Sequence, residues 1–204
     1  MKTLLTSLGL LASTTVFAQQ AEQPPLQTLL RPGTHCGFFV AASAQYARLD
    51  GQDALAATGR IGVSFNRSFA LGLGGTALTN GRIPNRWDDP IDTSSPDYLA
   101  AAYGGIYLEP MFPAGKAIHL TFPVLLGAGA ATKERDLNGP YYRYQADEFL
   151  IVEPGVQLEV NLLKYVALGA GASYRMTTGL NLPDTSSKAL NGMSAGVTLK
   201  LGLL

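Results

Sequence analysis

The chain has 204 residues, of which 15% are charged and 23 are glycine. Soluble globular proteins carry about 25% charged residues and about 7% glycine, so this chain is poor in charge and rich in glycine. Its 15 basic and 15 acidic residues cancel, which excludes the basic field of a nucleic-acid-binding protein. The glycines follow no Gly-X-Y period, so a collagen-like chain is excluded, and the length predicts one domain.

Residues 1–18 have the pattern of a targeting segment. Lys2 gives a positive start, a leucine-rich apolar stretch runs to Val16, and Ala18 is the small residue of a cleavage site. The pattern predicts a secretory signal peptide over 1–18. A transmembrane anchor needs about 20 apolar residues, whereas this stretch is shorter and contains several Ser and Thr. We therefore expect export, and loss of Lys2 leaves a formal charge of −1.

Residues 19–36 contain three prolines and several glutamines, which predicts a flexible periplasmic tail. Cys36 is the only cysteine, so no intramolecular disulfide forms. It lies far beyond Ala18, which excludes a lipid anchor at the cleavage point, and we interpret it as an incidental small apolar residue. No run of 18 apolar residues follows the signal segment, so a helical membrane protein is excluded.

From residue 37 onward, bulky and small residues alternate with a period of two, which predicts strands with two different faces. Eight such segments occur, over 38–47, 55–65, 69–74, 98–112, 117–131, 149–162, 166–176 and 193–203. The links 66–68, 113–116 and 163–165 are short, while 79–97, 132–148 and 178–191 are long, and only 50–53 breaks this alternation. Short links at one end and long loops at the other are typical of an outer-membrane barrel.

The composition of the small face indicates which face is buried. It is mostly Gly, Ala, Ser and Thr, and its ionisable residues are Arg60, Glu109, His119, Glu153, Glu159, Arg175 and Lys200. Seven such groups are too few to keep a whole exterior dissolved, so we expect them to line the interior while the bulky face contacts lipid. The prediction is an all-β, transmembrane, eight-stranded antiparallel up-and-down β-barrel over 37–204. The alternative is a secreted soluble barrel that binds an apolar ligand.

Aromatic residues on the bulky face support this orientation. Phe38, Phe65, Phe69 and Phe112 lie toward the short links, and Tyr46, Tyr98 and Tyr174 lie toward the long ones. Two such groups predict aromatic girdles at the two membrane boundaries.

This plan resembles the small eight-stranded outer-membrane β-barrel family, similar to the outer-membrane protein A and X barrels of Gram-negative bacteria. The local features that carry the resemblance are Phe69 to Gly74 and Val166 to Gly171, each opening a strand after a tight turn. The resemblance implies that the protein is located in the cell outer membrane. It indicates the fold and does not indicate an activity. The chain departs from the family by ending on Leu204, where members usually end on an aromatic residue.

Three prolines, Pro110, Pro123 and Pro154, interrupt successive strands of the expected barrel. A closed barrel has no free edge on which a missing N–H is harmless. We therefore expect local bulges in strands four to six, or strand ends nearer the middle of the wall.

The interior charges are compatible with two functions of the lumen. If the turn 163–165 centres on Lys164, Glu153 faces Arg175, which predicts a direct ion pair within a wider charge network. Eight strands leave a bore that side chains fill, so we expect a closed structural plug. The alternative is a narrow ion-conducting pore whose charges set its selectivity.

Two further functions depend on particular residues. His119 and Thr121 form a His-x-hydroxyl pair, which raises the alternative of an outer-membrane lipid-modifying enzyme. Both residues point into the lumen, away from lipid, so we expect no enzyme, no catalytic residue and no cofactor. Two distant histidines and one cysteine also predict no metal site.

The long links carry the candidates for surface contact. These are Trp87, Tyr141, Tyr142, Arg143 and Tyr144. Exposed Tyr and Arg are common anchors of contact surfaces. We therefore expect a structural role or a role in surface interaction. The expected partners are outer-membrane lipids, lipopolysaccharide or an extracellular partner, and nucleic acid is not expected.

Overall fold

A computed structural model describes residues 34–80, 98–113, 115–134, 145–182 and 185–202. The strands are β1 (Cys36–Leu49), β2 (Gln52–Phe65), β3 (Phe69–Thr79), β4 (Tyr98–Phe112), β5 (Ile118–Thr121), β6 (Val124–Glu134), β7 (Gln145–Leu163), β8 (Val166–Thr178) and β9 (Gly192–Gly202). No helix in these residues is long and apolar enough to cross a membrane.

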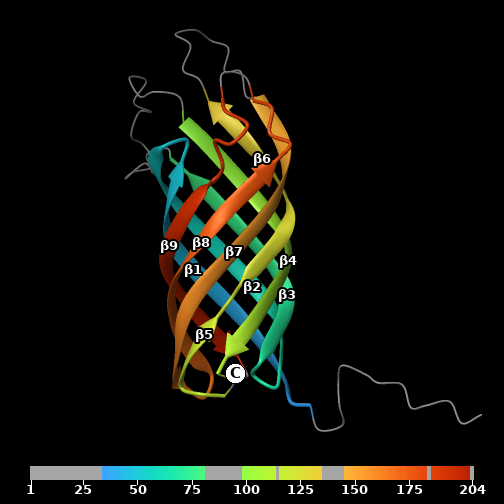
Figure 1. The fold of residues 1–204 in the computed structure, drawn as a ribbon, viewed down its shortest axis with the longest axis vertical. Coiled ribbons are helices and arrows are strands. Elements are labelled where there is room, and N and C mark those ends of the chain that lie inside the picture. The colour runs from blue at the N-terminus through green and yellow to red at the C-terminus, as the bar shows by residue number, and fades with distance from the viewer. Residues whose placement is uncertain (1–33, 81–97, 114, 135–144, 183–184, 203–204) are drawn as a thin grey trace, which may run out of the picture. The chain divides into compact units, whose positions relative to one another are not determined.

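The strands form a closed ring in which every neighbouring pair is antiparallel (Figure 1). The ring closes where β1 pairs with β9, as between Val40 and Leu201. β5 and β6 together occupy one position between β4 and β7. Their register is continuous, because Leu108 faces Val124 of β6 and Met111 faces Thr121 of β5. The expected eight-stranded up-and-down barrel is confirmed, with its fifth strand in two segments.

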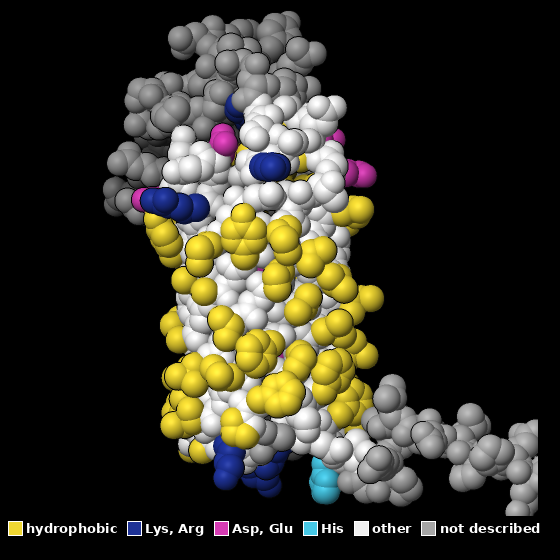
Figure 2. All heavy atoms as spheres, in the orientation of Figure 1, with side chains coloured by type: hydrophobic (Ala, Val, Ile, Leu, Met, Phe, Trp, Pro, Cys, Tyr) yellow, Lys and Arg dark blue, Asp and Glu magenta, His cyan; other side chains and the backbone are white. Residues whose placement is uncertain are grey.

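Side chains along each strand alternate between the outside and the inside of the barrel. Leu73, Leu150 and Val197 are at least 60% exposed, and Figure 2 shows hydrophobic side chains covering the wall between the two ends. Polar side chains such as Thr198 and Glu109 are buried. An apolar exterior around a polar interior is the reverse of a soluble barrel and matches a wall that faces lipid. The secreted soluble barrel is therefore excluded.

Large interior side chains face glycines on the neighbouring strand. Arg60 faces Gly74, Gln157 faces Gly171, and Tyr107 faces Gly72. Because an eight-stranded bore is narrow, a facing glycine leaves room for each of these three large side chains. The glycine surplus of the sequence therefore has a packing role.

The exposed aromatic residues lie near both ends of the wall. Phe38, Phe69 and Phe112 are exposed toward the short turns, as are Phe122 and Tyr165. Tyr46 and Tyr174 are exposed toward the opposite end, and Phe65 is half-buried. These positions are those expected for two girdles.

The prolines do not produce the expected bulges. The only register shift among the described strand pairs lies between Asn161 and Leu163 of β7. Phe122 N still donates to Pro110 O at 2.9 Å, and Gly155 N donates to Pro123 O at 2.7 Å. Pro110 and Pro123 thus lack a donor but keep an accepting carbonyl. The register also continues past Pro154, which faces Val124. The strand expected over 117–131 is interrupted at residues 122 and 123, between β5 and β6 and toward the end of the short turns.

Candidate functional site

The interior holds the seven ionisable side chains that the alternating pattern assigns to the lumen. All are at most 8% exposed. They are Arg60, Glu109, His119, Glu153, Glu159, Arg175 and Lys200. A buried charge is costly unless it is paired and hydrogen-bonded, so the partners of these groups decide what the interior does.

Lys200 of β9 is the centre of the lower interior, on the side of the short turns. Its Nζ lies 2.8 Å from Glu109 Oε1 and 2.6 Å from Glu159 Oε2. The Nζ also lies 5.3 Å from the centroid of the Phe39 ring, which packs beside it. One cation of β9 thus bridges a carboxylate of β4 and a carboxylate of β7 inside the bore.

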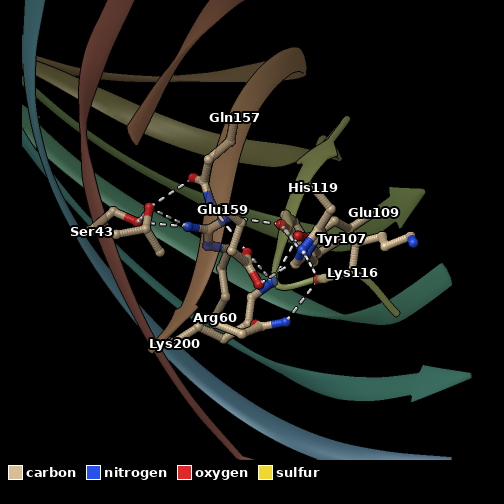
Figure 3. A network of polar contacts seen from close by, with 11 residues as sticks. Ser43, Arg60, Tyr107, Glu109, Lys116, His119, Gln157, Glu159 and Lys200 are labelled. Atoms are coloured by element: carbon tan, nitrogen blue, oxygen red, sulfur yellow. Dashed lines mark hydrogen bonds and ion pairs between the residues drawn. The ribbon is translucent and has the colours of Figure 1, made fainter. Parts of the chain in front are cut away.

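Arg60 and three neutral side chains extend these ion pairs into a closed ring of hydrogen bonds (Figure 3). Tyr107 donates to Glu109 at 2.5 Å and accepts from Arg60 at 2.7 Å. Arg60 donates to Thr198 at 3.0 Å. The ring returns through Gln157, which accepts from Thr198 at 2.9 Å and donates to Glu159 at 3.4 Å. We call these residues the lumen ring: Arg60, Tyr107, Glu109, Gln157, Glu159, Thr198 and Lys200.

Arg60 has an unusual set of partners for a buried guanidinium. It donates to Tyr107, Thr198 and also Ser43, at 2.7 Å, and its Nε has no partner. A cavity of about 50 Å³ lies beside it, which is large enough for a few water molecules. Three polar side chains and a small cavity thus surround the Arg60 guanidinium.

His119 lies at the edge of the lumen ring and does not pair with Thr121. Its Nε2 is 3.5 Å from Glu159 Oε1, and its Nδ1 is 3.2 Å from the Lys116 carbonyl oxygen. Thr121 Oγ1 is buried without a hydrogen-bond partner. His119 therefore contacts Glu159 of the lumen ring and does not contact the Thr121 hydroxyl.

The expected ion pair between Glu153 and Arg175 is not formed, although the predicted register is correct. Val152 faces Met176 and Gly155 faces Ser173, so Glu153 and Arg175 are opposite one another. Glu153 instead accepts from Tyr103 and Ser173, each at 2.6 Å. Other acceptors hold the guanidinium.

Arg175 bonds to the link between β8 and β9 and to β1. Its Nε donates to the Leu190 carbonyl at 3.2 Å, and its Nη2 donates to the Arg48 carbonyl at 2.7 Å. Its Nη1 donates to Ser194. Leu190 belongs to the link, so this side chain fastens the link to the inner wall.

The link closes the end of the barrel opposite the short turns. Leu180, Leu182 and Leu190 are at most 5% exposed. They belong to one apolar cluster with side chains from the inner wall, among them Leu49, Leu78, Leu99, Phe149 and Ile151. We call this cluster the apolar plug. The interior thus holds charged pairs toward one end and packed apolar side chains toward the other.

The remaining site residues divide into two groups. Trp87, Tyr141, Tyr142, Arg143 and Tyr144 lie outside the described residues. Tyr107, Gln157, Thr198 and Ser43 were not singled out from the sequence. Alternation already places these four on the inward face, so a search for all polar inward residues finds them. In the described part of the chain, His, Cys, Asp and Glu form no group able to hold a metal ion.

No protein-family model and no curated protein sequence matches the chain. Solved structures do. Neisserial surface protein A (NspA) matches with a TM-score of 0.50 and 15% identity, over 84% of this chain and 99% of that one. Ail, the attachment invasion locus protein of Yersinia pestis, solved with the heparin analogue sucrose octasulfate, matches with a TM-score of 0.48 and 12% identity over 82% and 97%.

The N-terminal β-barrel domain of Pseudomonas aeruginosa OprF matches with a TM-score of 0.46 and 11% identity, over 80% of this chain and 96% of that one. At these identities the match to NspA shows a shared fold. It agrees with the strand pairing and the lipid-facing wall. The chain has the fold of the small eight-stranded outer-membrane β-barrels of Gram-negative bacteria.

Proposed function

We propose that this protein is a structural outer-membrane barrel that acts through its surface, with a closed lumen and interactions made by the long links. The observation that carries the proposal is the double closure of the bore. Lys200 bonds to two carboxylates at one end, and Leu190 packs into the apolar plug at the other. Because a bore closed in this way does not carry solutes, the function would depend on contacts made by the outer surface of the protein.

The alternative of an ion-conducting pore requires both closures to open. An ion passing the lumen ring would have to separate Lys200 from Glu109 and Glu159, and breaking a buried pair is strongly destabilising. It would then meet the apolar plug, where nothing replaces its hydration shell. Both barriers favour a barrel that does not conduct.

Planar-bilayer recording tests the closed lumen. Purified protein, verified as folded by its faster migration in unboiled than in boiled SDS gel samples, should give no steady single-channel steps. Detergent without protein is the control for bilayer leakage. Steady steps that disappear in a Glu153→Ala variant would show a pore and overturn the closed-lumen proposal.

The surface role belongs to the links at the end opposite the short turns. The link 135–144 contributes Tyr141, Tyr142, Arg143 and Tyr144, and the link 80–97 contributes Trp87. Aromatic and Arg side chains supply most of the energy of many contact surfaces. The partner would be lipopolysaccharide or an extracellular surface. His119 contacts Glu159 and not Thr121, so the His-x-hydroxyl pair does not support the alternative of a lipid-modifying enzyme.

We also propose that residues 1–18 are removed on export and that 19–36 form the periplasmic tail. The support is the pattern of charge, apolar stretch and small residue that ends at Ala18. N-terminal sequencing of protein from outer-membrane fractions should begin at Gln19. A mature chain that retains Met1 would contradict the proposal.

A further inference from the structure

The two ends of the barrel carry different exposed charges. At the end of the short turns, the exposed Lys, Arg and His residues in the described part of the chain are His35, Arg67, Lys116 and Lys164, and the residues described there include no exposed Asp or Glu. The opposite end mixes both signs, with Arg48, Asp50, Asp53, Glu148 and Lys188 exposed. On the face drawn in Figure 2, the dark blue of Lys and Arg and the cyan of a histidine mark the lower rim, while dark blue and the magenta of Asp and Glu both mark the upper end. We call Arg67, Lys116 and Lys164 the basic rim.

The basic rim lies just beyond the aromatic residues that end the apolar wall. Arg67 is two residues from the exposed Phe69, and Lys164 adjoins the exposed Tyr165. Since a strand advances about 3.3 Å per residue along a tilted path, the cations are within roughly 3–13 Å of this aromatic belt. Aromatic belts lie at the level of the lipid headgroups. The cations are therefore at the height of the headgroup phosphates.

Two of these cations border one hollow of the surface. A groove of about 460 Å³ lies between the β2–β3 and β7–β8 turns, with Arg67, Lys164 and Ser64 among its lining residues. Its floor is held in place because Asn66 N donates to the His35 carbonyl, and His35 N donates to Asn66 Oδ1, both at 2.9 Å. A phosphate in this groove would meet a cation on each side.

The backbone of Arg67 supports a role for its side chain. Arg67 has a φ of 55°, next to Asn66 with a φ of 51°. Glycine adopts this left-handed conformation at lower cost, and Gly or Asn is the usual residue in such hairpin turns. The conformation of this turn therefore does not by itself account for an arginine at position 67.

We propose that the basic rim binds the phosphate groups of anionic phospholipids in the inner leaflet of the outer membrane. The proposal uses the orientation in which short turns face the periplasm and does not depend on the closed lumen or the long links. Attraction of basic groups to anionic headgroups at a membrane surface supplies the energy. The anionic polymer of the cell wall is the other possible ligand on the periplasmic side. Because the cations lie beside the aromatic belt rather than far below it, lipid phosphate fits their position better than that polymer does.

Electron spin resonance of lipids beside the barrel tests the proposal. The protein is reconstituted in phosphatidylcholine vesicles that contain spin-labelled phosphatidylglycerol or, separately, spin-labelled phosphatidylcholine. We expect the motionally restricted fraction to show about threefold preference for phosphatidylglycerol. A triple variant, Arg67→Gln with Lys116→Gln and Lys164→Gln, should show no preference. The heat shift in SDS gels confirms that each variant is folded.

The matched control removes three cations from the opposite end, by Arg48→Gln, Lys133→Gln and Lys188→Gln. It should keep the preference. A wild-type chain without preference, a rim variant that keeps it, or equal losses in both triple variants would overturn the proposal. Excess inorganic phosphate, compared with chloride of equal ionic strength, should leave the preference intact. Its loss would identify free phosphate as the occupant and would also overturn the proposal.

Two further measurements separate a binding role from a structural one. Arg67→Gly relieves the left-handed backbone, so it should leave resistance to urea unchanged or higher while lowering the preference. Lower resistance with an unchanged preference would make Arg67 a structural residue and contradict the proposal. Co-sedimentation with purified cell-wall sacculi should not depend on the basic rim. Loss of that binding with an intact lipid preference would assign the rim to the cell wall instead.

Discussion

Lys200 of β9 and Glu109 of β4 meet across the bore, with Nζ 2.8 Å from Oε1, although they are 91 residues apart in the chain. Neither strand pairs with the other in the ring. The contact therefore spans the interior rather than following the sheet, and it links opposite parts of the wall.

Replacing this lysine should destabilise the barrel strongly. Lys200→Met leaves Glu109 and Glu159 buried without their cation, and we expect a loss of about 3–5 kcal/mol in the free energy of unfolding. Urea unfolding in lipid vesicles measures it. Lys188→Met, at an exposed position, is the control and should change stability by less than about 0.5 kcal/mol. A loss at Lys200 no larger than the control would show that the lumen ring contributes little.

Two glycines of β2 should respond differently to the same substitution. A Cβ at Gly62 would lie 2.5 Å from the Leu71 carbonyl oxygen and 3.0 Å from the Phe39 ring, whereas a Cβ at Gly59 meets nothing within 4 Å. Gly62→Ala should therefore cost about 1–3 kcal/mol, while Gly59→Ala should be close to neutral. The same urea titration tests both variants. Equal effects would argue against a packing role for interior glycine.

A proline-to-alanine change should strengthen the wall between β5 and β7. The facing pair Pro123 and Gly155 has one ladder hydrogen bond, from Gly155 N to Pro123 O at 2.7 Å, where a regular antiparallel pair exchanges two. Pro123→Ala supplies the second donor, so amide exchange around Gly155 should slow. Hydrogen exchange with mass spectrometry measures this. Pro140→Ala, outside the nine strands, controls for the change in chain entropy, and unchanged protection near Gly155 would count against the missing bond.

Removing the aromatic side chains of one link should abolish surface binding without affecting membrane insertion. The variant replaces Tyr141, Tyr142, Arg143 and Tyr144 by Ser. Adhesion of cells that express the protein, and binding of purified protein to lipopolysaccharide, are the two measurements. Insertion is checked by the heat shift, and Ser substitution of Lys188 in the link 179–191 is the control. Unchanged adhesion and unchanged lipopolysaccharide binding would remove this link from the proposed function.

The sequence by itself determined the wall of the barrel. The period-two alternation placed Arg60 and Lys200 inside and Leu73 outside, because the pleat of a strand sends successive side chains to opposite faces. The short turn at Lys164 also determined that Glu153 faces Arg175, since the length of a hairpin link sets the register of its two strands. Both features are local, and both can be read without knowing where distant strands lie.

Only the tertiary structure decided which interior groups bond to each other. Glu153 and Arg175 face one another, yet Arg175 instead reaches the Leu190 carbonyl, because the link 179–191 folds into the mouth of the barrel. Lys200 meets Glu109 only because ring closure brings β9 and β4 to opposite sides of one narrow bore. Contacts across the bore depend on the tilt and stagger of all eight strand positions together, a property that no single segment of the sequence contains.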